Sequence, residues 1–131
     1  MESLTERMKK AGDALARLHE VAIRDDLSDL ERDGFIQRFE FCFEILWKCA
    51  KDYLRDVEGL DAASPKKVIR MSREVGLLTD EETEHALEMA NDRNQISHMY
   101  DEQMAVKLVE RIRRYDVLMQ RWYQKMKTVF L

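Results

Sequence analysis

The stretch between Ser28 and Gly59 most constrains the fold of this chain. Ser28 and Glu31 form a Ser-x-x-Glu capping box and Gly59 is a natural helix stop, so one long helix is predicted to run to about Glu58. On a helical wheel its polar side chains fill a sector of only about 120°. Most other positions are apolar: Phe35, Ile36, Phe39, Cys42, Phe43, Ile45, Leu46, Trp47, Cys49, Ala50, Tyr53 and Leu54. We therefore expect a central helix that contacts several helices or a second subunit.

Helical periodicity and helix-end signals recur along the rest of the sequence. Gly 4 and Pro 1 leave few places for a helix to stop, and no segment requires a β-strand. The chain of 131 residues has the size of one domain, residues 1–131. The pattern predicts an all-α, up-and-down four-helix bundle with an additional short helix. The expected helices cover residues 3–24, Ser28 to Glu58, Ser64 to Gly76, Asp80 into the segment at Arg93, and about seven turns after Asp101, with Met104 and Leu108 among the inward residues of the last.

Composition excludes several classes of protein. No run of about 20 apolar residues can span a membrane, and the first residues do not form a signal segment, so we expect a cytoplasmic protein. A net charge of −4 argues against a protein that coats nucleic acid indiscriminately. The last helix is the basic one, so a local binding site for RNA is compatible with the sequence. Cys42 and Cys49, about 10 Å apart on one helix, are too distant for a disulfide. The scattered histidines lack metal-ligand spacing, so no metal and no cofactor is expected.

The polar segment from Arg93 to Tyr100 stands out in this amphipathic chain. If it is helical, Arg93, Ser97 and Tyr100 fall on one stripe, and Asn94 and His98 on the neighbouring one. Arg93 and His98 then diverge by about 140°. One straight helix cannot aim both at one small target. Either the helix breaks near His98 or a second copy of the chain completes the site.

The residues of this segment allow a structural and a functional interpretation. In the structural one, Arg93 pairs with Glu82 or Glu88, and the other polar side chains cap a helix end or pack half-buried. In the functional one, Arg93 grips a phosphate and His98 moves a proton near neutral pH. Those are the requirements of metal-free RNA cleavage, in which the 2′-hydroxyl attacks its own phosphate.

Supporting groups are expected on the same segment and on the central helix. In the functional interpretation, Asn94 and Ser97 orient the catalytic pair or the substrate. Glu40 and Glu44 lie four residues apart, with Lys48 four further on. They either brace one another along the helix or act beside the polar segment.

The arrangement Arg93-x4-His98-x-Tyr100, in the form Arg-Asn-x-x-Ser-His-x-Tyr, resembles the signature of HEPN-domain proteins. More narrowly, the chain resembles the nucleotidyltransferase substrate-binding subgroup, the HepT-like toxins of bacterial HEPN/MNT pairs. Arg-x4-His alone is a weak signal, but the similarity covers residues from about 30 to 110. It includes Gln37-Arg38-Phe39-Glu40, Phe43-Glu44, Trp47-Lys48, Ser64-Pro65, Gly76-Leu77 and Tyr100-Asp101-Glu102.

This resemblance implies a HEPN-like homodimer in which two Arg93/His98 segments meet across the interface. It also implies a metal-independent ribonuclease toxin that cleaves RNA with Arg93 and His98. The partner would be a minimal nucleotidyltransferase, the MNT antitoxin, which transfers AMP from ATP to Tyr100. That modification adds charge and bulk beside the arginine. The alternative is a noncatalytic nucleotide- or substrate-binding subunit of a two-component nucleotidyltransferase. RNA cleavage by the isolated protein would distinguish the toxin from this subunit.

Overall fold

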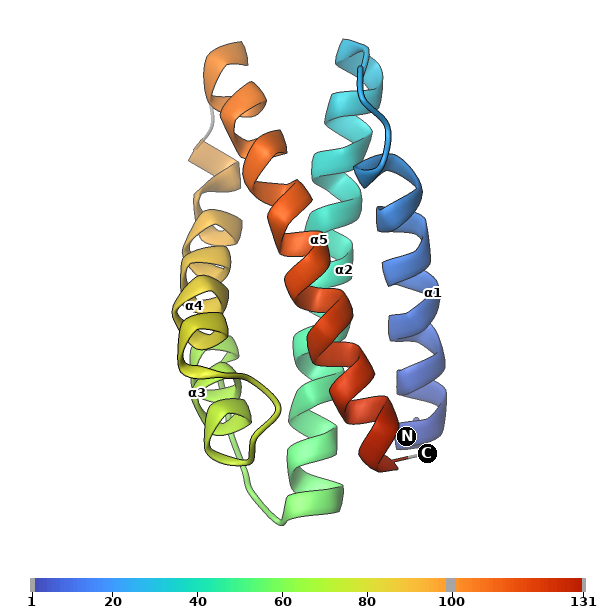
Figure 1. The fold of residues 1–131 in the computed structure, drawn as a ribbon, viewed down its shortest axis with the longest axis vertical. Coiled ribbons are helices and arrows are strands. Elements are labelled where there is room, and N and C mark those ends of the chain that lie inside the picture. Colours follow the sequence, from blue (N-terminus) through green and yellow to red (C-terminus); the bar gives the residue numbers. More distant parts are fainter. Residues whose placement is uncertain (1, 99–100, 131) are drawn as a thin grey trace.

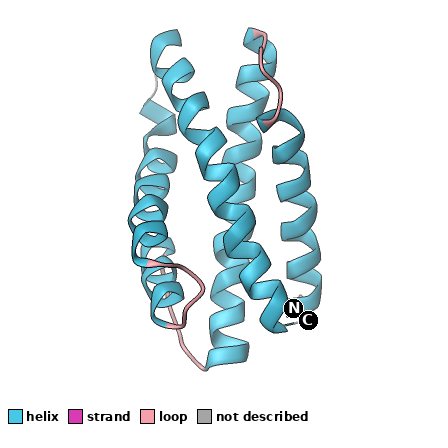
Figure 2. Cartoon of the chain, viewed as in Figure 1, coloured by secondary structure: helices cyan, strands magenta, loops and turns pink. Residues whose placement is uncertain are grey.

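The computed structural model describes residues 2–98 and 101–130, and these residues form helices joined by short loops (Figure 1). Figure 2 shows that the described chain contains helices and loops only. The predicted all-α bundle with one additional short helix is therefore confirmed. Its elements are α1 (Leu4–Ala22), α2 (Asp29–Glu58), α3 (Pro65–Glu74), α4 (Asp80–Gln95), the 3-10 turn η1 (Ile96–His98) and α5 (Glu102–Phe130).

The capping signals act where the sequence places them. The Ser28 hydroxyl accepts a hydrogen bond from Glu31 N at 3.1 Å, and Glu31 Oε1 accepts one from Ser28 N at 2.9 Å. Gly59 ends α2 with a left-handed φ of 69°, a conformation that costs glycine little. At the start of α5, Asp101 Oδ1 accepts a hydrogen bond from Met104 N at 2.8 Å, as expected of a cap.

Helix α2 lies at the centre of the bundle and contacts α1, α3 and α5 (Figure 1). Its side chains Phe35, Phe39 and Leu54 are fully buried. The short α3 packs between α2 and α4, and α4 packs against α5. This arrangement confirms that several helices share the wide apolar arc of α2, and it leaves only a narrow stripe of α2 exposed.

The buried core agrees with the helical periodicity except near the ends of helices. Leu108 and Ile112 of α5 are buried as expected, whereas Met104 remains 44% exposed. The expectation for Met104 was wrong because this residue lies in the first turn of α5, where the core ends. Ile45 and Trp47 of α2 are half-buried and pack at the edge of the core.

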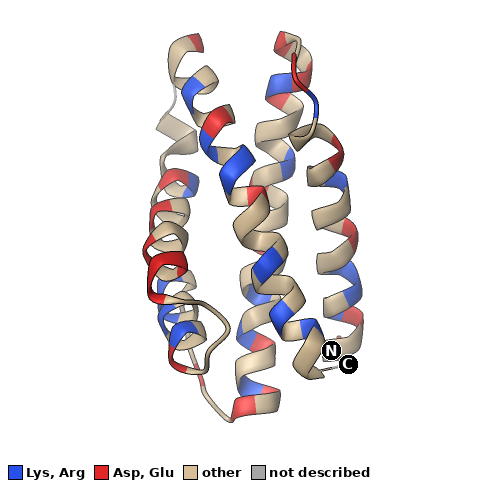
Figure 3. Cartoon of the chain, viewed as in Figure 1, with Lys and Arg blue, Asp and Glu red and all other residues tan. Residues whose placement is uncertain are grey.

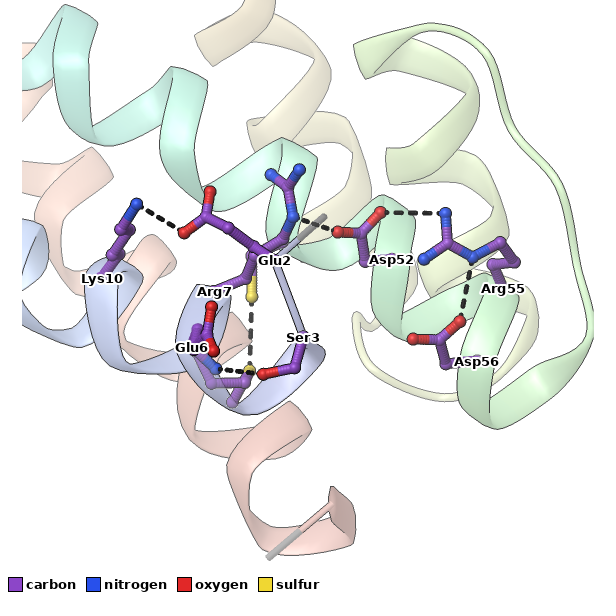
Figure 4. Close-up of polar contacts among 10 residues, drawn as sticks. Glu2, Ser3, Glu6, Arg7, Lys10, Asp52, Arg55 and Asp56 are labelled. Carbon is purple, nitrogen blue, oxygen red and sulfur yellow. Dashed lines mark hydrogen bonds and ion pairs between the residues drawn. The ribbon is translucent and has the colours of Figure 1, made fainter.

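A polar cluster ties the start of α1 to α2 (Figure 4). Asp52 of α2 is buried and forms an ion pair with Arg7 of α1. Arg55 Nη1 lies 3.4 Å from Asp52 Oδ1, and Arg55 Nε donates to Asp56 Oδ1 at 2.9 Å. Asp52 therefore faces two cations, as a buried carboxylate requires.

Both cysteines are free and buried in the core, as predicted. Burial raises the pKa of the Cys42 and Cys49 thiols to about 12. The Sγ atom of Cys49 lies 3.3 Å from Sδ of Met8, across the contact between α2 and α1. The thiols stay protonated near neutral pH, so they pack as small apolar side chains.

Two helical glycines offer a matched test of this packing. A Cβ atom at Gly12 would lie 2.7 Å from the Tyr123 hydroxyl, which donates a hydrogen bond to Met8 O at 2.9 Å. At Gly34 a Cβ would meet no atom within 4 Å. We expect Gly34→Ala to raise the free energy of unfolding by about 0.5–1 kcal/mol through helix propensity. Gly12→Ala should lower it by about 1 kcal/mol because overpacking outweighs that gain.

Urea denaturation of both variants, followed by circular dichroism, measures these changes. Equal stabilisation by the two alanines would show that α1 and α5 do not approach each other as described.

Candidate functional site

Arg93 lies in the last turn of α4 and points toward the middle of α2. Its Nη1 atom is 3.8 Å from Glu40 Oε2, and its Nη2 atom is 3.7 Å from Glu44 Oε1. The arginine side chain is 29% exposed, although its Nε atom is buried. The structure thus brings together three of the predicted site residues, which come from two different helices.

Glu44 is held by more than Arg93. Its Oε2 atom accepts a hydrogen bond from Trp47 Nε1 at 3.3 Å and lies 3.6 Å from Lys48 Nζ. The pairing of Glu44 with Lys48 matches the expected bracing along the helix, while the pairing with Arg93 places both acids beside the polar segment. Arg93 does not pair with Glu82 or Glu88, because these acids contact Thr79, Arg121 and Tyr115 instead.

The hydrogen-bonding capacity of Arg93 is largely unused. A guanidinium carries five N–H donors. Within the described part of the chain, its buried Nε has no hydrogen-bond partner, and both carboxylates lie beyond hydrogen-bond distance. The contact with Glu40 and Glu44 is therefore an ion pair without hydrogen bonds, which leaves the Nη donors unused within the described residues.

The helix changes type between Arg93 and His98. The α-helix ends at Gln95 and continues as the 3-10 turn η1 through His98. Two α-helical steps and three 3-10 steps place His98 about 160° around the axis from Arg93. The change therefore keeps the two residues apart. The stripe expected for Arg93 and Ser97 assumed a continuous α-helix, whereas the helix changes type at Ile96, near His98.

The remaining predicted site residues surround this turn. Asn94, Ser97 and His98 are exposed. Tyr100, the predicted AMP acceptor, lies outside the described residues. In one chain, then, Arg93 and His98 do not converge on one point.

A half-buried network beside Arg93 was missed by the sequence analysis. Asp92 Oδ2 accepts hydrogen bonds from Tyr115 Oη and, at 2.7 Å, from Arg111 Nε of α5. Tyr115 also stacks on Phe39, with ring centroids 5.7 Å apart. These contacts join α4, α5 and α2 directly next to the candidate site. No spacing in the sequence links Asp92 to residues about 20 positions away, so only the packing of α4 on α5 reveals the network.

The network shifts the pKa values of its members. Burial, reinforced by the hydrogen bond to Asp92, raises the pKa of the Tyr115 phenol well above its usual range. The hydrogen bond to Asp92 raises the pKa of Arg111. Tyr115 therefore remains a neutral donor and Arg111 remains charged.

The cations of α5 do not form one continuous binding face. Arg111 is bound to Asp92, and Arg113 Nη1 donates to the carbonyl of Ala22 at 2.6 Å. Figure 3 shows basic and acidic residues interspersed along α5. Two of the basic residues noted in the sequence thus join α5 to other helices: Arg111 to α4 and Arg113 to α1. Among the described residues, no three histidine, cysteine or acidic side chains group as a metal site, and none of the helices is long and apolar enough to cross a membrane.

Sequence comparison identifies the family. Residues 6–128 match the family described as nucleotidyltransferase substrate binding protein like. The chain belongs to this family, as the motif at Arg93 predicted. None of the curated proteins matches the sequence.

Solved structures support the same assignment. A Thermus thermophilus protein is 48% identical, with a TM-score of 0.85 over 88% of this chain and 98% of its own. A tri-AMPylated Shewanella oneidensis HEPN toxin, solved with its MNT antitoxin, is 16% identical, with a TM-score of 0.70 over 98% of this chain and 99% of its own. A MntA–HpeT toxin–antitoxin mutant is 12% identical, with a TM-score of 0.76 over 95% of this chain and 97% of its own. At this low identity the last two establish a shared HEPN-like fold.

The network at Asp92 predicts a difference between two buried tyrosines. Tyr115→Phe removes a donor to Asp92 and should lower the free energy of unfolding by about 1–2 kcal/mol. The control is Tyr53→Phe: the side chain of Tyr53 is buried, its hydroxyl makes no hydrogen bond within the described residues, and its loss should cost less. Burial raises the pKa of Tyr115, so the protonated phenol contributes to the free energy of unfolding below pH 10. This contribution is lost as the pH rises further, because the phenol of the unfolded chain then ionises. Urea titrations at pH 7 and above pH 10 measure both effects. Equal costs for the two variants would contradict the proposed bond.

Proposed function

We propose that this protein is the toxin component of a HEPN/MNT toxin–antitoxin pair and a metal-independent ribonuclease. Arg93 and His98 would be its catalytic residues, with Asn94, Ser97, Glu40 and Glu44 in support. The observation that carries the proposal is the state of Arg93. Its guanidinium is partly exposed and held in place by two carboxylates, with its donors unused among the described residues. A planar donor of this kind is suited to a phosphate.

The chemistry follows from these groups. The RNA 2′-oxygen forms a bond to the adjacent phosphorus, and the bond from phosphorus to the 5′-oxygen breaks. A base accepts the 2′-hydroxyl proton, and an acid gives a proton to the leaving 5′-oxygen. Exposed His98 is an imidazole suited to such transfers near neutral pH. Arg93 would stabilise the negative charge that develops on the phosphate oxygens.

The separation of Arg93 and His98 supports a site shared by two chains. Within one chain they lie on opposite sides of the end of α4, and the change to 3-10 geometry keeps them apart. A two-fold homodimer would place the Arg93 of one copy near the His98 of the other. Each of the two sites would then hold one arginine and one imidazole.

Regulation is proposed to occur at Tyr100. The tyrosine oxygen would attack the α-phosphorus of ATP, the bond to the β-phosphate would break, and pyrophosphate would leave. The partner nucleotidyltransferase must supply magnesium and a base, because an unperturbed phenol ionises only near pH 10. The added AMP phosphate would repel RNA two residues from His98.

A second candidate is a noncatalytic subunit that binds nucleotide or substrate for a separate nucleotidyltransferase. The description of the matched family favours this function. Both candidates predict a nucleotidyltransferase partner, so RNA cleavage by the isolated protein distinguishes them.

The first prediction of this proposal is RNA cleavage in the presence of EDTA. Arg93→Ala and His98→Ala should each lower the rate by about a hundredfold or more, because charge stabilisation or proton transfer is lost. His98 is exposed, and the ion pairs of half-buried Arg93 are long and partly exposed, so the loss of either residue should leave the thermal unfolding temperature almost unchanged. Cleavage is followed with a labelled single-stranded RNA. If the parent cleaves no RNA, the noncatalytic function is favoured.

Mixing the two inactive variants tests the shared site. After unfolding and joint refolding, about half of the dimers are mixed, and each holds one intact Arg93/His98 pair, so about a quarter of the parent rate should return. If sedimentation shows dimers but the cleavage rate of the mixture does not recover, both residues of each site lie in one chain.

The second prediction is that Tyr100 is the AMP acceptor. Incubation with the cognate nucleotidyltransferase, ATP and magnesium should add AMP to the parent but not to Tyr100→Phe, because the phenylalanine has no attacking oxygen. Peptide mass spectrometry locates the modification, and Tyr115→Phe serves as a control that keeps Tyr100. Modification of Tyr100→Phe at the parent level would remove Tyr100 from the mechanism.

A further inference from the structure

A shallow groove runs between α1 and α2 on the side of α2 that carries Glu44. Phe41 forms part of its floor and is 62% exposed, an unusual state for a large aromatic residue. Half-buried Ile45 and the buried Ala14 lie beside it. Glu44 both lines this groove and pairs with Arg93, so the groove leads directly to the candidate catalytic site.

The groove carries more cations than acids, although the whole chain is negative. Its charged lining residues are Arg7, Lys10, Arg17, Arg38 and Lys48, with Glu2, Asp13 and Glu44. Arg7 is committed to buried Asp52, and Lys10 pairs with Glu2, as Figure 4 shows. Arg17 makes no ion pair among the described residues, and Lys48 is 53% exposed. Exposed ion pairs are weak, so a phosphate can displace a carboxylate from Lys10 or Lys48 at low cost.

Other routes toward Arg93 are less favourable for a polyanion. The exposed face of α4 is acidic and carries Glu81, Glu84 and Glu88, visible as a red stripe in Figure 3. On α5, Arg111 and Arg113 are tied to partners within the chain. Exposed Lys107, Arg114, Lys125 and Lys127 of α5 make no ion pair among the described residues, but the aromatic side chains Tyr115, Trp122 and Tyr123 of that helix are buried. The groove along α1 and α2 is therefore the route that joins cations to an exposed aromatic side chain.

We infer that the groove between α1 and α2 is the binding path for single-stranded RNA at the proposed catalytic site. A base stacks on Phe41, and phosphates contact Arg17 and Lys48 on either side of it. Single-strand binding surfaces combine an aromatic platform with flanking cations in this way. Arg38 donates to the carbonyl of Arg17 at 2.6 Å and lies 3.4 Å from Glu20, so Arg17 and Lys48 are the cations left for phosphate. The inference rests on the proposed ribonuclease function.

The test measures binding of a fluorescein-labelled single-stranded RNA by anisotropy. All proteins carry His98→Ala, so that the RNA is not cleaved. Phe41→Ala should weaken binding about tenfold through lost stacking. Arg17→Gln and Lys48→Gln should each weaken it and lower the slope of log affinity against log salt by about 0.7. In the catalytically intact chain, the same changes should raise KM and leave kcat unaltered.

Matched controls lie away from the groove. Val117→Ala removes apolar surface from a residue that is 53% exposed on α5, and Arg70→Gln removes an exposed cation on α3. Neither variant should change RNA affinity. If the controls weaken RNA binding as much as the changes in the groove do, the inference is overturned.

Other outcomes separate this inference from the proposed function. If the parent cleaves RNA but Phe41→Ala binds and cleaves as the parent does, the groove assignment fails alone. If Phe41→Ala converts a dimer to a monomer in sedimentation, the groove is a contact between two copies of the chain, and the RNA assignment is wrong. If the His98→Ala chain binds no RNA and the parent cleaves none, the proposed function fails as well.

Discussion

Burial of α2 on three sides is the constraint on which the rest of the structure depends. Helices α1, α3 and α5 cover most of its surface, so its polar groups must share the narrow exposed stripe. Glu40 and Glu44 occupy this stripe and meet Arg93 from α4, while exposed Phe41 lies between them in sequence. The packing of the core therefore places the candidate catalytic arginine and the groove on adjacent sides of one helix.

The ion pair between Arg93 and the two carboxylates has a double effect. Two negative charges near one guanidinium stabilise its position. The gain in free energy is modest because the groups are partly exposed. The same charges oppose the approach of a phosphate. The distances near 3.7 Å reduce this conflict, since they leave the N–H donors unused within the described chain. Arg93 is thus oriented without being fully neutralised by hydrogen bonds.

Helix periodicity and end signals were enough to predict the bundle. The capping box at Ser28, the stop at Gly59 and the cap at Asp101 are local, so the sequence alone identifies them. The network around Asp92 could not be predicted, because its partners on α5 depend on how two helices pack. The contact of Arg93 with Glu40 and Glu44 was predicted only as one of two possibilities, because the acids expected to pair with Arg93 directly were on its own helix. The 3-10 turn after Gln95 lacks a glycine or proline that would mark it.

The end of α4 imposes a final condition on function. Arg93 forms ion pairs with Glu40 and Glu44 of α2, and its neighbour in sequence, Asp92, is hydrogen-bonded to Arg111 of α5. His98 lies in the next turn, where no comparable set of contacts holds it among the described residues. A site that needs both groups would therefore combine an arginine held by two ion pairs with a histidine on a less constrained turn. If two chains share the site, the rigid arginine of one positions the substrate against the histidine of the other. Proton transfer then depends on assembly of the dimer, and changes at the residues that follow His98 can regulate it without disturbing the core.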